Sequence, residues 1–108
     1  MNRDKSIGMF IGLAIGDALG APLEFQEARE PHNFLTKYTT GGAHNVSIGE
    51  WTDDTSMALA IAKSLIEKQT FDADDIMQKF CNWYKKGEYS TRGRCFDIGG
   101  TVSVALRS

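Results

Sequence analysis

The stretch Trp51–Ile66, with the sequence WTDDTSMALAIAKSLI, decides the fold class because polar residues open an otherwise apolar run. Small and apolar side chains fill the rest of the stretch at the spacing of a buried helix. Two carboxylates, Asp53 and Asp54, and the Thr52 hydroxyl therefore lie where free backbone N–H groups and the helix dipole favour negative charge. The pattern predicts a helix over about 53–68 in an all-α protein.

Two interpretations of this helix start are open. In the first, Thr52 is an ordinary N-cap, and Asp53 and Asp54 stabilise the first turn. In the second, the same oxygens bind a hard cation, because Mg²⁺ and Mn²⁺ prefer carboxylate, hydroxyl and water ligands. A cap needs one acceptor, so a second carboxylate with flanking threonines is more than capping requires.

Three other segments have helical patterns. The first, from about Asp4 to Leu19, carries a glycine at every fourth position: Gly8, Gly12, Gly16 and Gly20. Each interior glycine costs a helix about 1 kcal/mol relative to alanine, so we expect close packing of another backbone and a central helix of a bundle. A further helix is expected from near Asp72 to Lys86, and another begins around Thr101–Leu106. Residues 21–51 are expected to be mostly irregular, since prolines and glycines punctuate them.

Length and charge limit the possible functions. The 108 residues allow a single domain or part of one, and 12 basic against 14 acidic residues give a net charge of −2. Such a balance has no electrostatic footprint for nucleic acid or an anionic membrane. The apolar run Ile7–Ile15 contains two glycines and is stopped by Asp17, so we expect no bilayer span.

The two cysteines and the C-terminal residue carry two further expectations. Cys81 and Cys95 have no C-x-x-C spacing and no signal peptide precedes them, so we expect reduced thiols in a cytoplasmic protein. The chain stops at Ser108 early in its last helical pattern, with no cap. We therefore expect it to be the front part of a longer domain.

Acidic residues at helix ends are the candidates for chemistry. Asp17 and Glu24 flank the exit of the glycine-rich helix, and Asp97 precedes the last helix. Each has an ordinary explanation: a hydrogen bond to loop backbone, a surface carboxylate and a turn residue, respectively. A helical bundle can also bring such ends into one cleft. His32 and His44 lack metal-ligand spacing and are expected to be loop residues.

Three motifs occur in a fixed order along the chain. They are G-x-x-x-G-x-A-x-G-D-A-x-G-x-x-x-E over 8–24, W-T-D-D-T over 51–55, and F-D-I-G-x-T over 96–101. Together they resemble the ADP-ribosylglycohydrolase family, especially the bacterial dinitrogenase-reductase-activating type. The resemblance implies a helical bundle with two Mg²⁺ or Mn²⁺ ions in a central cleft. It also implies hydrolysis of the bond between ADP-ribose and a protein side chain or a small-molecule acceptor.

The resemblance also implies roles for individual residues. Carried over by motif, Thr52, Asp53 and Asp54 would bind metal, and Glu24 and Asp97 would be the catalytic carboxylates, with acid and base unassigned between them. Asp17 would have a supporting structural role. The family's second acidic motif, D-x-D followed by Thr or Ser, is absent, as is its glycine-rich segment for ADP-ribose. Residues 1–108 would then be the N-terminal part of one such domain, and we expect the isolated chain to be inactive.

Two other hypotheses compete with the hydrolase. A non-catalytic module could keep the fold and bind ADP-ribose or a partner protein, without need of a metal-activated water. A plain helical scaffold would use every acid as a cap, so that Asp54→Ala would cost about 1 kcal/mol of stability and nothing else.

Overall fold

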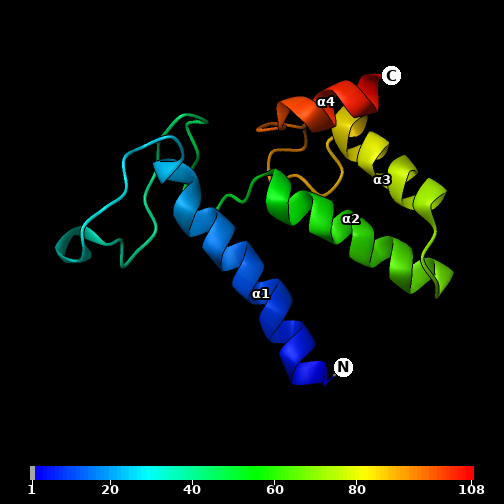
Figure 1. Ribbon diagram of the computed structural model, residues 1–108, viewed down its shortest axis with the longest axis horizontal. Coiled ribbons are helices and arrows are strands. Elements are labelled where there is room, and N and C mark those ends of the chain that lie inside the picture. Colours follow the sequence, from blue (N-terminus) through cyan, green and yellow to red (C-terminus); the bar gives the residue numbers. More distant parts are fainter. Residues whose placement is uncertain (1) are drawn as a thin grey trace. The chain divides into compact units, whose positions relative to one another are not determined.

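Helices are the main regular elements of the computed structural model, which describes residues 2–108. Four α-helices follow one another: α1 (Arg3–Gly20), α2 (Asp53–Lys68), α3 (Ala73–Lys86) and α4 (Gly100–Arg107). Two short 3₁₀ helices, η1 (Ala21–Leu23) and η2 (Pro31–Asn33), lie between α1 and α2 (Figure 1). The prediction of an all-α fold is confirmed, and each predicted helix lies within two residues of its expected ends.

The chain divides into two compact units, Met1–Trp51 (unit 1) and Thr52–Ser108 (unit 2). Unit 1 contains α1 and the long loop with η1 and η2, whereas unit 2 contains α2, α3 and α4. The assignment of both units to one larger domain stays a prediction.

In unit 1, α1 is a well-capped helix with an exposed apolar surface. The Asn2 side chain accepts hydrogen bonds from the backbone N–H groups of Asp4 and Lys5, at 2.8 and 3.3 Å. Large apolar side chains nevertheless remain exposed along the whole helix: Ile7, Met9, Ile11, Leu13 and Ile15. Gly8, Gly12, Gly16 and Gly20 form a stripe along α1 (the glycine stripe). Apart from adjacent residues and the nearby backbone of α1 itself, no atom of the unit lies within 4 Å of a Cβ built at these glycines, so the expected packing of another backbone is not formed within this unit.

The apolar helical segment is longer than the run that the sequence suggested. Arg3–Leu23 spans 21 residues with a mean hydropathy of 1.5, which is long and apolar enough to cross a membrane by length and composition alone. Core helices of soluble proteins and signal sequences meet the same criteria. The expectation of no bilayer span, made for the shorter run Ile7–Ile15, stays a prediction.

The loop after α1 folds back on η1. Gly41 and Val46 form an isolated antiparallel bridge, with N···O distances of 2.9 and 3.0 Å. Gly42 has a φ of +76°, and a Cβ at this position would collide with the backbone of Pro22 in η1. Glycine is therefore required here both by the left-handed conformation and by the close approach of the turn to η1.

In unit 2, α2 and α3 lie side by side and α4 packs against α3 (Figure 1). The buried face of α2 carries small residues at every fourth position, Ser56, Ala60 and Ser64, which are at most 2% exposed. Residues four apart share one helix face, so this stripe lets α3 approach closely. On α3, Ile76 and Trp83 are buried, and Trp83 is the largest fully buried side chain.

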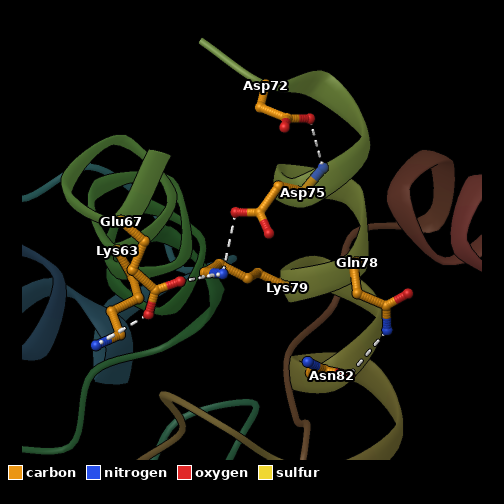
Figure 2. Close-up of polar contacts among 7 residues, drawn as sticks. All are labelled: Lys63, Glu67, Asp72, Asp75, Gln78, Lys79 and Asn82. Carbon is orange, nitrogen blue, oxygen red and sulfur yellow. Dashed lines mark hydrogen bonds and ion pairs between the residues drawn. The ribbon is translucent and has the colours of Figure 1, made fainter. Parts of the chain in front are cut away.

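A buried lysine joins α2 to α3. The Lys79 ammonium lies 2.8 Å from Glu67 Oε2 on α2 and 3.0 Å from Asp75 Oδ2 on its own helix (Figure 2). Lys63 contacts the other oxygen of Glu67 at 3.1 Å. The carboxylates of Glu67 and then Asp75 hold the pKa of Lys79 above its ordinary value. The charge of a nearly buried lysine is thus balanced by two carboxylates.

Both ends of α3 follow the sequence prediction. Asp72 is the N-cap, and its side chain accepts a hydrogen bond from the Asp75 backbone N–H at 3.0 Å. Gly87 ends the helix with a φ of +75°, and its N–H donates to the Trp83 carbonyl. A Cβ at Gly87 would collide with the backbone of Gly93, so the following loop turns back immediately over this helix end.

Candidate functional site

The start of α2 carries the three predicted metal ligands. Thr52 occupies the N-cap position with extended backbone, and Asp53 and Asp54 are the first two helical residues. The Thr52 side chain makes no capping hydrogen bond to the first turn, although its residue is only 4% exposed. The simple capping interpretation therefore fails for this hydroxyl. Asp53 is half-buried and Asp54 is exposed, so their carboxylates lie at the edge of the unit.

The loop between α3 and α4 is tied to this helix start. Ser56 Oγ on α2 donates to the Tyr89 carbonyl at 3.0 Å. Within the loop, Ser90 Oγ donates to the Arg94 carbonyl at 2.6 Å, and the Arg92 guanidinium lies over the Phe96 ring, 3.9 Å from its centroid. Arg92 thus supports Phe96, the loop residue that precedes Asp97.

Asp97 follows in a conformation that few non-glycine residues adopt. Its φ is +52°, in the left-handed region that Asp and Asn tolerate best among ordinary residues. Asp97 is half-buried and lies two residues before Gly99, the N-cap of α4. Unusual backbone conformations of this kind often occur at functional sites.

The negative charges of Asp53 and Asp97 both affect the pKa of the Cys95 thiol. Burial raises the pKa of Cys95, and the negative charges of Asp53 and then Asp97 raise the pKa further. A negative charge near a thiol disfavours the thiolate, so both carboxylates oppose ionisation of Cys95. Asp53 and Asp97 are 44 positions apart in the sequence, and no motif linked either of them to Cys95.

Glu24, the remaining catalytic candidate, lies in unit 1 at the end of η1. Its backbone N–H donates to the Ala21 carbonyl at 3.3 Å. Its carboxylate Oε2 lies 3.1 Å from His44 Nε2. The sequence predicted His44 only as a loop residue. The structure shows in addition that its ring contacts the Glu24 carboxylate. No spacing rule joins positions 24 and 44, and the turn at Gly41–Val46 is what brings them together.

The earlier carboxylate, Asp17, lies in the last turn of α1. Its backbone carbonyl accepts a hydrogen bond from the N–H of Ala21, the residue that begins η1. The side chain is half-buried. The supporting structural role of Asp17 stays a prediction.

The donor set at the start of α2 fits a hard divalent cation. Two carboxylates and a hydroxyl stand on consecutive residues, and a third carboxylate, Asp97, lies in the loop that the Ser56–Tyr89 hydrogen bond ties to this helix start. Oxygen ligands of this kind are the preferred partners of Mg²⁺ and Mn²⁺. The metal roles of Thr52, Asp53 and Asp54, and the catalytic roles of Glu24 and Asp97, stay predictions.

Comparison with known proteins agrees with the motifs. The ADP-ribosylarginine hydrolase of Serratia proteamaculans is 47% identical over 103 residues, which cover 95% of this chain and 28% of the relative. That of Pseudomonas putida is 43% identical, with 95% and 27% covered. The ADP-ribosyl-[dinitrogen reductase] glycohydrolase of Rhodospirillum rubrum is 39% identical over 108 residues, with 97% and 34% covered. The chain thus spans about a third or less of each of these curated relatives.

The match to a protein family extends over the whole chain. The family described as ADP-ribosylglycohydrolase matches residues 1–108, which include all three motifs and every candidate site residue. The all-helical architecture agrees with this match. This chain therefore belongs to the ADP-ribosylglycohydrolase family.

Proposed function

We propose that this chain supplies the N-terminal part of the active site of a metal-dependent hydrolase, which removes ADP-ribose from a protein side chain or a small-molecule conjugate. The observation that carries the proposal is the start of α2. There, Thr52 is buried at the N-cap without capping the helix, next to two carboxylates. Two of the relatives are named as an ADP-ribosylarginine hydrolase and an ADP-ribosyl-[dinitrogen reductase] glycohydrolase. These names favour an ADP-ribosylated protein as the substrate.

In this proposal the start of α2 holds the cation. Thr52, Asp53 and Asp54 offer one hydroxyl and two carboxylates on consecutive residues, and the helix N-terminus fixes their backbone. A bound Mg²⁺ or Mn²⁺ would orient the ribose hydroxyls and activate a water. The burial of Thr52 favours a fixed hydroxyl, and the exposure of Asp54 leaves its carboxylate accessible to the ion.

Asp97 and Glu24 are the carboxylates that we assign to proton transfer. A general acid or base needs a carboxylate within hydrogen-bond reach of the reacting group. Asp97 has a strained, left-handed backbone in the loop that is tied to the start of α2, and Glu24 is held at the end of η1 by His44. One of the two would protonate the leaving group and the other would take a proton from the water.

The setting that we propose is the cytoplasm. Both cysteines are free thiols, and burial and nearby carboxylates raise the pKa of Cys95, which keeps this thiol protonated and unreactive. A reducing compartment suits such thiols.

Metal binding is the first test of the proposal. We expect Mn²⁺ added to the ¹⁵N-labelled chain to broaden the amide signals of residues 52–55 and of Asp97 selectively, because the paramagnetic effect is local. The double variant Asp53→Asn, Asp54→Asn should lose this response. Asp72→Asn with Asp74→Asn is the matched control, since it removes two carboxylates from the start of α3 instead. Equal broadening at both helix starts would contradict a metal site at α2.

Hydrolysis is the second test. Residues 1–108 can replace the matching region of the Serratia hydrolase, with release of ADP-ribose from ADP-ribosylarginine as the assay. We expect Asp97→Asn or Glu24→Gln to lower kcat by about 10² to 10⁴, the scale of general acid–base catalysis. A chimera that binds ADP-ribose equally well with and without Mg²⁺ and Mn²⁺, and hydrolyses nothing, would instead support the non-catalytic binding module.

A further inference from the structure

A histidine holds the Glu24 side chain within unit 1. His44 Nε2 lies 3.1 Å from Glu24 Oε2, and the two side chains are 20% and 39% exposed. An ionised carboxylate is acceptor-only, so His44 donates its Nε2–H in this contact. Glu24 Oε1 accepts no hydrogen bond from residues 2–108, so one carboxylate oxygen is held while the other is available.

The turn that carries His44 is anchored on the element that carries Glu24. Gly41 and Val46 pair across the turn, and Gly42 lies so close to Pro22 that no side chain fits between them. Pro22 belongs to η1, and Glu24 is the residue that ends η1. The histidine and the carboxylate therefore project from two backbone segments in direct contact, which fixes the distance that the hydrogen bond has to span.

The residue after Glu24 gives the histidine ring a further neighbour. Phe25 has a φ of +67°, and its ring centroid lies 6.3 Å from that of His44 at an interplanar angle of 57°. Tilted aromatic pairs at this separation are favourable. The His44 ring is thus in contact with two consecutive residues, Glu24 on its nitrogen edge and Phe25 beside it.

We propose that His44 is a positioning residue for Glu24, a role that rests on the proposed function of Glu24 in proton transfer. The imidazole holds Oε2 and so selects one rotamer of a side chain that three staggered wells per torsion would otherwise share. Oε1 is then presented in a constant direction to the water or leaving group. Positioning of this kind removes part of the entropic cost of reaching a reactive geometry.

The experiment compares three variants of the 108-residue chain by NMR: His44→Ala, His44→Gln and His44→Asn. We expect the side-chain three-bond couplings of Glu24 to indicate one dominant rotamer in the wild type. His44→Ala should move the couplings to averaged values. His44→Gln should restore them, because its amide nitrogen reaches about as far as imidazole Nε2, whereas His44→Asn reaches only about as far as Nδ1 and should not. A merely structural residue would show no such distinction between Gln and Asn.

His32→Ala is the control, since His32 is exposed in η2. Averaged Glu24 couplings in the wild type, or equal couplings in His44→Gln and His44→Asn, would overturn the positioning role. Mn²⁺ added to the same samples separates this result from the proposed function. Broadening at residues 52–55 should persist in all three His44 variants. Its absence in every sample would contradict the metal site, and with it the catalytic purpose of the contact, even if His44 holds Glu24.

Discussion

The two units contain similar stripes of small residues with different neighbours. In unit 2, Ser56, Ala60 and Ser64 recur at every fourth position of α2 and are buried in a unit where α2 packs against α3. In unit 1, the four stripe glycines recur at the same interval of α1, and no atom of that unit lies near them. The spacing permits close packing in both cases, but only in unit 2 does another helix of the same unit pack against the helix that carries the stripe.

The difference shows where each unit obtains its stability. Unit 2 has its own core around Trp83 and its own charge network around Lys79. In unit 1, α1 keeps large apolar side chains exposed on most of its surface, a composition typical of a helix that is buried on all sides. The chain spans about a third or less of the curated relatives, and no described segment of unit 1 covers this apolar surface.

The largest effect is expected from the core of unit 2. Trp83→Ala removes a side chain that is 1% exposed, and truncation of a buried Trp costs about 3–5 kcal/mol through lost burial and the cavity left behind. We expect native-state hydrogen exchange to show this loss in α2, α3 and α4, while the amides of α1 keep their protection. Ile66→Ala is the control, because Ile66 is 67% exposed. An equal loss in α1 would contradict the separate stability of the two units.

Helix positions were predictable from sequence because the signals for them are local. Asp72 caps α3 and Gly87 ends it in the left-handed conformation, as their residue types indicate. The α2 pattern gave both ends of that helix. The packing of the glycine stripe was not predictable in the same way. Small residues at every fourth position allow a close neighbour, but they do not indicate which segment that neighbour is.

The candidate site was predictable only residue by residue. The motifs named Glu24, Asp53, Asp54 and Asp97, but they did not indicate that the loop from Gly87 to Gly99 is tied to the start of α2 by the hydrogen bond between Ser56 and Tyr89. His44 was missed as a partner of Glu24 because the contact is made by the packing of Gly42 on Pro22. Contacts between loops depend on close approach, which has no periodic pattern in the sequence.

A smaller effect is expected from the charges that join α2 to α3. Hydrogen bonds from Lys79 and then Lys63 lower the pKa of Glu67, and the nearby Ser64 hydroxyl and then Lys79 lower the pKa of Asp75. A carboxyl group whose pKa is lowered in the folded state stabilises the fold at pH values above its ordinary pKa. That ordinary pKa is 4.5 for Glu67 and 3.8 for Asp75. That contribution is lost as the pH falls through the lowered value. Unit 2 should therefore lose stability on acidification below about pH 4.5, the ordinary value of Glu.

Lys79→Met tests this expectation, because methionine keeps much of the buried stem and removes the charge. We expect urea unfolding of the variant to show a flatter dependence on pH between about 5 and 3 than the wild type, since both carboxyl groups then titrate nearer their ordinary values. Lys85→Met, on the exposed last turn of α3, is the control. The same slope in Lys79→Met and wild type would show that the network does not contribute to the stability of unit 2.

The smallest effect is expected at the glycine stripe of α1, and its sign decides what the stripe contacts. Gly12→Ala should stabilise α1 by about 1 kcal/mol if the stripe is open, because alanine is the better helix former and meets no atom of the unit. Gly42→Ala is the matched change in the same unit and should destabilise it, since the left-handed φ and Pro22 both oppose a side chain there. Hydrogen exchange of the α1 amides and of the Gly41–Val46 bridge measures the two effects separately. Destabilisation by Gly12→Ala would mean that a backbone already packs on the stripe, because only a close neighbour makes one methyl group unfavourable there. The comparison between α1 and α2 would then be one of two packed helices.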